Sequence, residues 1–346
     1  MRIGLFQRSL PEPDRKPGGV EVFVERLAGK LVERGHAVTV FSFVPAPAGA
    51  PFRYVRLEPA WAGRNRLAHL SVVPVVLNRI DTSALDVLHL HGDDWFFFRR
   101  RLPTVRTFHG SALLEARSAA RWRRRLSQLA VFPLELMSSR LATASYSVAP
   151  GMPPGYRLRG TLGLGIDLPN EDISRPDPPI ILFVGTWTGR KRGRFLYETF
   201  KSYVQPRVPS AELWLVSDAA PVNTKGVRWL PRPTDTELSD LYRRAWVLCL
   251  PSTYEGFGMP YLEAMAHATP VIASPNTGSR FISDSGRAAW LAPDDSLGPS
   301  LVRLLGDSRA RRRLAEAGRD RARAFSWDQM LDLHERAYEL AISRWG

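Results

Sequence analysis

The sequence predicts an α/β protein made of two domains, each with its own parallel sheet. Two segments read as an apolar strand, a glycine-containing loop, a helix and a second apolar strand, which is the unit that builds parallel sheets. One segment opens the chain at residues 3–43, and the other spans residues 246–273. A chain of 346 residues is too long for one comfortable hydrophobic core and suits two domains.

The opening segment starts with a strand at residues 3–6 and a loop that ends in Gly18-Gly19-Val20-Glu21. Apolar residues then recur at helical spacing as far as Arg34, and Gly35 ends the helix before a strand at residues 37–43. The glycines lie at the first strand-to-helix turn, where open α/β sheets bind their ligands. They lack the spacing of a dinucleotide-binding loop.

Two further apolar runs, residues 87–91 and 105–109, read as buried strands that end in histidine. The carboxyl ends of strands carry the chemistry of α/β proteins, so His109 is a candidate functional residue. His89 and His91 are interpreted as core or rim residues, because no carboxylate or cysteine cluster accompanies them to hold a metal.

Residues 115–137 hold the densest positive charge, in the run RWRRR at residues 121–125. As a helix, this segment has a basic flank and an apolar flank that includes Trp122 and Leu126, a pattern typical of helices that lie on anionic lipid. The alternative is an ordinary solvated helix whose apolar side is core. Pro133 interrupts the run and argues against one long helix.

Composition narrows the classes of function. The 48 basic residues exceed the 34 acidic ones, which gives a net charge of +14 and favours anionic partners. The single cysteine, Cys249, falls in an apolar strand, so neither a disulfide framework nor a thiolate metal site is expected. No apolar run reaches the roughly 18 residues of a membrane span, and the first residues do not form a signal peptide. We therefore expect a cytoplasmic protein.

A polar, proline-rich stretch at residues 169–179 predicts a linker, and residues 180–184 predict the first strand of a second domain. That strand leads into the glycine loop GTWTGRKRG at residues 185–193, which carries three cations. Residues 234–237 predict a capping box for a later helix, and a last amphipathic helix is expected from Ser326 through Ile342.

The most informative stretch is PSTYEGFGMPYLEAMAHATP, residues 251–270. Gly256 and Gly258 allow the backbone to approach a ligand, and Pro260 suits the first turn of a helix. The amide groups there would favour an anion, usually a phosphate. Glu255 and Glu263 bracket this site, and fixed carboxylates bind sugar hydroxyls well.

The pattern Glu255-GFGMPYL-Glu263, followed by AMAHATPVIAS, resembles the E-x7-E signature of family 4 retaining glycosyltransferases of the GT-B fold. The resemblance implies two Rossmann-like parallel-sheet domains that face each other across a cleft. It assigns residues 1–168 to an acceptor domain, 169–179 to a linker and 180–325 to a nucleotide-sugar donor domain. The helix at residues 326–346 is expected to cross back to the first domain.

The resemblance also implies roles for single residues. It places Glu255 by the donor sugar and Glu263 on the ribose, with Arg190 and Lys191 on the diphosphate, and Arg192 competes with Lys191 for its role. Matched to the family, the catalytic residues are Glu255, Arg190, Lys191 and His109, and the donor-binding residues are Gly19, Gly185, Phe257, Gly258, Met259, Glu263 and Arg232. No metal ligand is expected.

Three positions depart from the family pattern. Thr186 stands where many members have Arg, and Pro231 stands where Gly is usual at the edge that reads the nucleobase. After Ala273, Gly278 matches the common G-G-x-x-E loop, but its Glu is missing. The base, the sugar and the acceptor stay open at this point.

The predicted function is that of a retaining, metal-independent glycosyltransferase that uses a nucleotide-diphosphate sugar as co-substrate. Its acceptor is expected to be a glycan, a lipid-linked or a small molecule in cell-surface polysaccharide or glycoconjugate synthesis, with contact to anionic membrane through residues 115–137. A GT-B nucleotide-sugar epimerase is the nearest alternative. A nucleic-acid-binding protein is a further one, although its basic residues would be divided among three separate segments.

Overall fold

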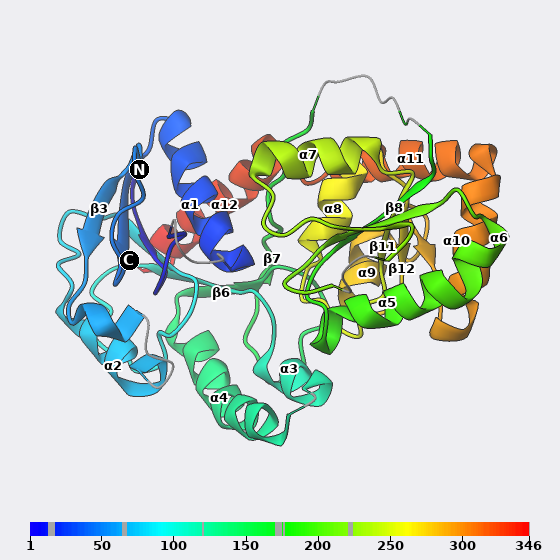
Figure 1. Cartoon of the computed structure of the whole chain (residues 1–346). Coiled ribbons are helices and arrows are strands. Elements are labelled where there is room, and N and C mark those ends of the chain that lie inside the picture. The colour runs from blue at the N-terminus through cyan, green and yellow to red at the C-terminus, as the bar shows by residue number, and fades with distance from the viewer. Residues whose placement is uncertain are drawn as a thin grey trace. The chain divides into compact units, whose positions relative to one another are not determined.

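The computed structural model describes residues 1–12, 18–63, 68–119, 121–169, 175, 177–220 and 224–345. Most of the predicted linker at residues 169–179 therefore lies outside the described residues. The chain forms two compact α/β units (Figure 1). Unit 1 comprises Met1–Arg117, Arg121–Gly165 and Trp327–Gly346, and unit 2 comprises Ser118–Ala120 and Ile166–Ser326.

Unit 1 is organised on a parallel sheet, with seven strands among the described residues in the order β3-β2-β1-β4-β5-β6-β7. Every residue of the central strands β4 and β5 is buried, as expected when helices cover both faces of a parallel sheet. The strands are β1 (Arg2–Phe6), β2 (Ala37–Ser42), β3 (Arg53–Arg56), β4 (Val87–Leu90), β5 (Thr104–Phe108), β6 (Ala144–Ser147) and β7 (Gly160–Thr161).

The helices of unit 1 include one from the far end of the chain. The α-helices are α1 (Gly19–Glu33), α2 (Ala68–Val76), α3 (Ala112–Ser118), α4 (Trp122–Leu141) and α12 (Trp327–Ser343), with short 3-10 turns at Ala60–Gly63 and Leu77–Arg79. Helix α12 lies beside α1 and contacts strands β4, β5 and β6 (Figure 1). Arg34, at the end of α1, pairs with Asp332 and Glu335 of α12 at 2.6 and 3.1 Å.

The prediction of a helix over residues 115–137 is wrong in its extent. Helix α3 ends at Ser118, and α4 begins only at Trp122 and continues to Leu141. Pro133 lies inside α4 rather than at its end. A proline lacks one N–H, so the helix can pass through it at the loss of a single hydrogen bond and some bending.

Unit 2 is built on a second parallel sheet, whose six described strands follow the order β10-β9-β8-β11-β12-β13. The strands are β8 (Ile180–Val184), β9 (Glu212–Val216), β10 (Val227–Trp229), β11 (Val247–Leu250), β12 (Val271–Ala273) and β13 (Trp290–Leu291). The strands predicted at 180–184 and 271–273 are confirmed with the same bounds. Cys249 is fully buried in β11, as predicted.

Helices cover both faces of the second sheet (Figure 1). They are α5 (Gly193–Thr199), α6 (Gln205–Arg207), α7 (Asp235–Arg244), α8 (Met259–Ala266), α9 (Thr277–Ile282), α10 (Leu297–Gly306) and α11 (Ser308–Arg323), with a π-helical turn at Phe200–Val204 and 3-10 turns at Gly189–Lys191 and Asp294–Ser296. The predicted capping box of α7 is confirmed, since Thr234 and Glu237 exchange side-chain and backbone hydrogen bonds.

Three buried histidines, His89, His91 and His334, and the half-buried His109 form a cluster where α12 meets the sheet of unit 1. His89 is hydrogen-bonded to Tyr338 of α12 at 2.9 Å and to Thr107 at 2.8 Å, and His91 is hydrogen-bonded to His109 at 3.0 Å. His334 of α12 packs against His89, with ring centroids 5.7 Å apart. The rings of His89, His91 and His334 lie in the core, where water cannot solvate a charged ring, and His109 lies at the edge of this cluster.

Burial lowers the pKa of each ring below the ordinary value of 6.5. The pKa of His109 falls to about 3 and that of His334 to about 4, and those of His89 and His91 also fall well below it. Below about pH 6.5 the unfolded chain therefore binds protons that the folded chain does not, so stability must fall as the pH falls.

We predict that the free energy of unfolding decreases between about pH 6.5 and pH 4, and that His334→Leu makes this decrease shallower by about 1 kcal/mol per pH unit. Leucine removes a titrating group that the folded state holds neutral and keeps an apolar side chain of similar bulk. Urea unfolding at several pH values measures the slope. Equal slopes for the variant and the parent protein would contradict the prediction.

Candidate active site

The carboxylate of Glu255 is held between two cations in unit 2. Its Oε2 atom lies 2.8 Å from Nη1 of Arg190, and its Oε1 atom lies 2.7 Å from Nζ of Lys191. The side chain of Glu255 is 5% exposed and that of Lys191 is 14% exposed, whereas that of Arg190 is 38% exposed. Three residues that the sequence named as catalytic therefore form one ion-paired group.

The charges of this group determine its protonation. Burial alone would raise the pKa of Glu255, but the positive charges of Lys191 and Arg190 outweigh burial and hold that pKa below its usual range. Burial lowers the pKa of Lys191, and the carboxylate of Glu255 opposes that shift. The carboxylate is charged at neutral pH because its partners are next to it.

A glycine makes this approach possible. A Cβ atom on Gly185 would lie 2.9 Å from Cζ of Phe183 and 3.0 Å from Cβ of Lys191, so a larger residue would displace the lysine stem. The loop is also bonded to the segment that carries Glu255. Arg190 accepts a hydrogen bond on its carbonyl from the amide of Thr253 at 2.9 Å and donates one to the carbonyl of Tyr254 at 2.7 Å.

Arg192 has a different set of partners. Its guanidinium forms a two-pronged contact with Asp294, with both N–O distances at 2.6 Å, and also donates to the carbonyl of Pro251 at 2.5 Å. Its backbone is left-handed, with φ of 57°. The geometry thus places Lys191, rather than Arg192, on Glu255, and Arg192 fastens the loop to its surroundings.

Helix α8 follows Glu255, and its start contains the glycine and the proline that the sequence analysis singled out. Gly258 precedes the helix with φ of 101°, a conformation that suits glycine, and Pro260 lies in the first turn. Phe257 is buried against Phe281 and Phe325, so its side chain is part of the core. Any donor contact at Phe257 would have to come from its backbone.

Glu263 lies one turn into α8 and is fixed by α7. The hydroxyl of Tyr242 donates a hydrogen bond of 2.6 Å to its Oε2 atom. Burial, together with the charge of Glu263, raises the pKa of Tyr242 well above its usual value, so the phenol stays a donor. Sequence reasoning did not identify Tyr242, because nothing local marks an aromatic residue on another helix as the partner of Glu263.

A second contact missed from sequence is the close packing of α9 on the Glu255 loop. A Cβ on Gly278 would come within 2.7 Å of both Cβ and the carbonyl oxygen of Glu255. Asn276 caps α9 and donates to the carbonyl of Ser252 at 3.0 Å. The small residue at position 278 therefore leaves the space that Glu255 occupies.

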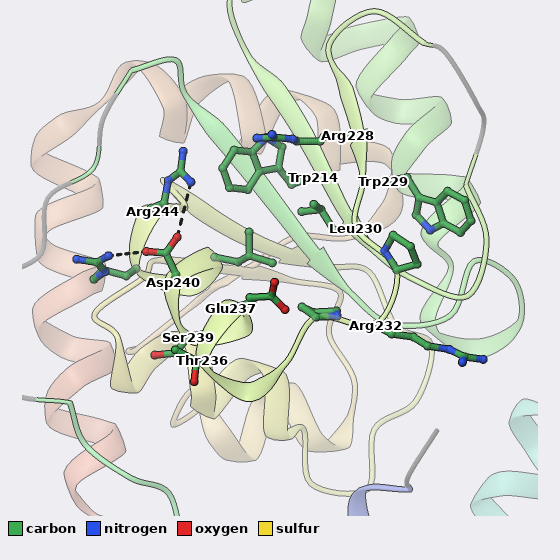
Figure 2. Close-up of a pocket in the computed structure, with 14 residues that line it drawn as sticks. Trp214, Arg228, Trp229, Leu230, Arg232, Thr236, Glu237, Ser239, Asp240 and Arg244 are labelled. Atoms are coloured by element: carbon green, nitrogen blue, oxygen red, sulfur yellow. Dashed lines mark hydrogen bonds and ion pairs between the residues drawn. The ribbon is translucent and has the colours of Figure 1, made fainter. Parts of the chain in front are cut away.

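Arg232 lies elsewhere in unit 2. It lines a groove of about 770 Å³ between α7 and the edge strand β10, together with Arg228, Trp229 and residues of α7 (Figure 2). Its backbone is left-handed, with φ of 52°. The structure places Arg232 in this groove and not in the group around Glu255.

Two candidate residues lie in unit 1. Gly19 is the first residue of α1, and a Cβ placed on it would meet no atom within 4 Å, so the space beside it is open. His109 follows β5 and is bonded through Nε2 to His91. With a pKa of about 3, caused first by burial and then by the charge of Arg106, His109 is a neutral imidazole at physiological pH.

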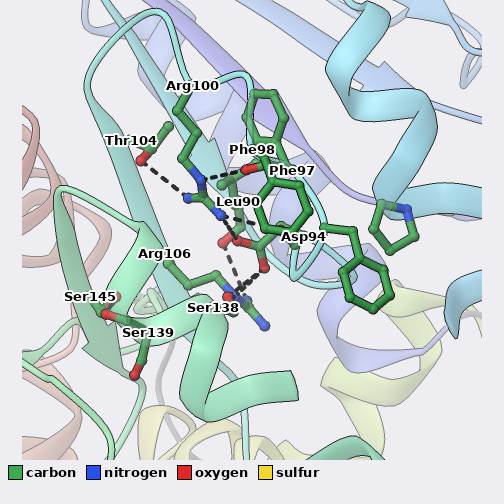
Figure 3. A network of polar contacts seen from close by, with 12 residues as sticks. Leu90, Asp94, Phe97, Phe98, Arg100, Thr104, Arg106, Ser138, Ser139 and Ser145 are labelled. Carbon is green, nitrogen blue, oxygen red and sulfur yellow. Dashed lines mark hydrogen bonds and ion pairs between the residues drawn. The ribbon is translucent and has the colours of Figure 1, made fainter. Parts of the chain in front are cut away.

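A buried ionic network connects the loop after β4 with β5 and α4 (Figure 3). Asp94, which is fully buried, lies 2.9 Å from Nη2 of Arg100 and 2.8 Å from Nε of Arg106, and it accepts a hydrogen bond of 2.8 Å from Ser138 of α4. Two guanidinium groups and a hydroxyl satisfy this carboxylate, so the network anchors the carboxyl-terminal half of α4.

The described residues contain neither a cluster suited to bind a metal ion nor a membrane-spanning helix. No group of three or more His, Cys, Asp or Glu side chains is placed to hold a metal ion within the ranges given above. Among the described helices, none combines the length and apolar character needed to cross a membrane.

Two family models match consecutive parts of the chain. The model described as Glycosyltransferase Family 4 matches residues 17–150, and the one described as Glycosyl transferases group 1 matches residues 178–307. The chain belongs to the family 4 glycosyltransferases. The expected fold and the expected class of enzyme are therefore confirmed: the protein is a glycosyltransferase with two parallel-sheet α/β domains.

Among curated proteins, the glycosyltransferase is 24% identical to a phosphatidyl-myo-inositol mannosyltransferase of Mycobacterium tuberculosis, over 98% of this chain and 97% of that protein. It is 42% identical to an MMP alpha-(1->4)-mannosyltransferase of Mycolicibacterium hassiacum over 117 residues. That match covers 32% of this chain and 28% of the relative.

Solved structures share the GT-B fold of this glycosyltransferase. A sucrose-phosphate synthase from Thermosynechococcus elongatus superposes with a TM-score of 0.79 at 21% identity, over 99% of each chain. The Anabaena protein HepE in complex with UDP-glucose superposes with a TM-score of 0.68 at 15% identity, also over 99% of each chain.

We predict that Glu255 and Lys191 are strongly coupled in stability. Glu255→Gln leaves a buried ammonium with no carboxylate and should lower the free energy of unfolding by about 3 kcal/mol, and Lys191→Met should lower it by about 2 kcal/mol because Arg190 still pairs with the carboxylate. The double variant should cost much less than the sum. Urea unfolding of the three variants measures the coupling.

The exposed pair Arg194–Glu198 is the matched control, since its atoms lie 2.8 Å apart but both side chains are more than half exposed. Its double-variant cycle should give less than about 1 kcal/mol. Additive effects at Glu255 and Lys191 would contradict the assignment of a buried ion pair.

Proposed function

We propose that this glycosyltransferase transfers a sugar from a nucleotide-diphosphate sugar with retention of configuration and without a metal ion. The observation that carries the proposal is the group of Glu255, Arg190 and Lys191 in front of the glycine-capped start of α8. It brings two cations, free backbone amides and a sugar-binding carboxylate to one place, within a motif that matches the family signature.

The chemistry needs positive charge where the diphosphate departs. In this reaction the bond between the sugar and the diphosphate breaks, and negative charge grows on the leaving phosphate oxygen. Arg190 and Lys191 are positioned to stabilise that charge, and the amides at the start of α8 add a partial positive charge. These groups do the work that a divalent cation does in metal-dependent transferases, which is the basis for proposing metal independence.

Glu255 has a separate role in the proposal. Before the donor binds, the carboxylate of Glu255 holds both cations in place and offsets the repulsion between their positive charges. When the donor is bound, the carboxylate accepts hydrogen bonds from the sugar hydroxyls, and the cations turn to the phosphates. The acceptor attacks the face that the diphosphate leaves, and the diphosphate takes the acceptor proton, so no residue of the chain becomes covalently bonded to the sugar.

The remaining site residues bind rather than react. Glu263, oriented by Tyr242, accepts hydrogen bonds from the ribose hydroxyls. The donor's backbone contacts come from Gly185, Phe257, Gly258 and Met259, and Arg232 lies at the edge that would read the base.

Two residues of unit 1 complete the proposal. Gly19 leaves room for phosphate and acceptor, and His109 touches the donor sugar as a neutral imidazole. The two curated relatives described above are mannosyltransferases, which favours glycoconjugate or polysaccharide synthesis with a glycan, lipid-linked or small-molecule acceptor.

We predict that Glu255→Gln abolishes sugar transfer but leaves affinity for a nucleotide diphosphate equal to that of the parent protein or higher, because it frees two cations. Glu263→Gln should instead weaken nucleotide affinity by about 1–3 kcal/mol, since ribose hydroxyls lose an ionised acceptor. Calorimetry with UDP and GDP, together with a transfer assay, separates the two effects.

Tyr242→Phe is the matched control, because it keeps Glu263 and removes only the hydroxyl that orients it. Its loss of affinity should be a few-fold. Equal losses of nucleotide affinity for Glu255→Gln and Glu263→Gln would overturn the division of roles.

Three further experiments test the reaction itself. Nuclear magnetic resonance of the product reports its anomeric configuration, and activity in excess EDTA tests metal independence. An isomerised sugar after incubation with the donor alone would indicate an epimerase instead.

We also propose that the enzyme works at an anionic membrane surface through α4. Trp122, Leu126 and Leu129 lie on one side of this helix and are 67%, 56% and 41% exposed. The arginines at positions 121 and 123–125 are exposed around them. The alternative, in which the apolar side of this segment is core, fits Val131, Phe132 and Met137 but not these three exposed residues. The exposed residues favour insertion of the indole between anionic headgroups.

We predict that the protein co-sediments with vesicles containing phosphatidylglycerol at low salt and not with pure phosphatidylcholine. Arg123→Glu with Arg124→Glu should weaken this binding by at least about a hundredfold, because each surface cation contributes about 1 kcal/mol and both charges are reversed. Vesicle sedimentation at increasing salt measures it, and screening should reduce the attraction.

Arg312→Glu with Arg313→Glu on α11 is the matched control, since it makes the same charge change at exposed positions of another helix. It should reduce binding only slightly. Trp122→Ser tests insertion, because it keeps every charge. Binding that both arginine pairs reduce equally would indicate attraction to net charge rather than a membrane-binding helix.

A further inference from the structure

Apart from Arg232, the residues that line the groove between α7 and β10 have no part in the proposed transfer reaction. Four guanidinium groups and two carboxylates line it, from Arg228, Arg232, Arg243, Arg244, Glu237 and Asp240. It encloses about 770 Å³, within the range of roughly 300–1,000 Å³ that small-molecule sites occupy. Figure 2 shows Arg228 and Arg244 beside Trp214, and the side chain of Arg232 extending away from them.

The two carboxylates are already occupied by other partners. Glu237 accepts hydrogen bonds from the backbone and the hydroxyl of Thr234, at 2.7 and 2.9 Å, in the capping box of α7. Asp240 pairs with Arg243 and with Arg244 on the same helix. No carboxylate of the described residues pairs with Arg228 or Arg232, so the groove keeps an excess of positive charge.

Tryptophans hold this charge in a fixed place. The guanidinium carbons of Arg228 and Arg244 lie 5.3 and 4.8 Å from the ring centroid of Trp214, which is buried (Figure 2). Trp229 differs, since its indole is 42% exposed while its N–H donates to the carbonyl of Ser217 at 3.1 Å. The ring is thus anchored at its polar edge and leaves apolar surface open to a ligand.

Helix α7 separates the groove from Glu263. Every residue from Thr236 to Arg244 lines the groove except Leu238 and Tyr242, which are four positions apart and share the opposite face. Tyr242 uses that opposite face to bond Glu263 on α8. A ligand in the groove would therefore contact the other side of the helix that orients the proposed ribose-binding residue.

We propose that this groove binds an acidic oligosaccharide at a site separate from the donor site. Fixed guanidinium groups recognise the carboxylates of uronic acid units, and the exposed face of an indole packs against the apolar face of a sugar ring. The groove is too short for the long basic stripe of a nucleic-acid site, and one exposed aromatic ring offers no series of stacking platforms. The site shares only Arg232 with the residues proposed to bind the donor, and the inference is independent of the acceptor and of the stereochemistry of transfer.

Calorimetry tests the proposal with trigalacturonic acid as the probe and maltotriose as its neutral counterpart. We expect trigalacturonic acid to bind, maltotriose not to bind, and the dissociation constant to rise with salt. Arg228→Ala and Trp229→Ala should each weaken binding at least tenfold. Arg287→Ala, an exposed arginine of unit 2 outside the groove, should change it less than twofold.

Three results would overturn the proposal. The first is equal binding of inorganic phosphate, which would make the groove a simple anion site. The second is displacement of trigalacturonic acid by UDP or GDP, which would make it part of the donor site. The third is unchanged binding in both groove variants when their thermal unfolding matches that of the parent protein. Each of these results leaves the outcome of the transfer assay with Glu255→Gln unaffected.

Discussion

A carboxylate buried between two cations organises the candidate site in unit 2. Glu255 is almost without solvent, so its charge can exist there only because Lys191 and Arg190 lie within 2.8 Å of it. The surrounding features serve this contact. Gly185 lets the lysine stem come close, Gly278 leaves room for the carboxylate, and Arg192 binds its loop to Asp294. A group held by so many neighbours is already in position before a ligand arrives, which lowers the reorganisation that a reaction requires.

The buried ionic groups around Asp94 and Glu255 differ in whether their partners leave anything for a ligand to bind. Asp94 is satisfied by two guanidinium groups and a serine hydroxyl, with all partners inside unit 1, and it connects α4 to the sheet. Glu255 has two partners that are themselves chemically useful, one of them more than a third exposed. The first arrangement is complete without a ligand. The second has cations that a diphosphate can compete for.

The features that could be predicted from the sequence are those set by residues close together along the chain. The strand–loop–helix unit around Glu255 and Glu263, the capping box at Thr234 and the buried strand that holds Cys249 are local patterns, and the structure contains all three. The pairing of Glu255 with residues more than sixty positions earlier has no periodic signal, and neither does the contact of Tyr242 with Glu263. The break between α3, which ends at Ser118, and α4, which begins at Trp122, was also missed, because the sequence pattern of charged and apolar residues continues across it.

The position of α12 has a consequence for how this protein forms during synthesis. The strands β4 and β5 leave the ribosome early, but Tyr338 and His334, which cover their buried histidines, follow only after the whole of unit 2. Until then the first sheet exposes an apolar face and imidazoles without their partners. The domain synthesised first is therefore the one completed last, whereas the described strands and helices of unit 2 all come from one continuous segment. Apolar surface exposed in this way during synthesis is prone to aggregation.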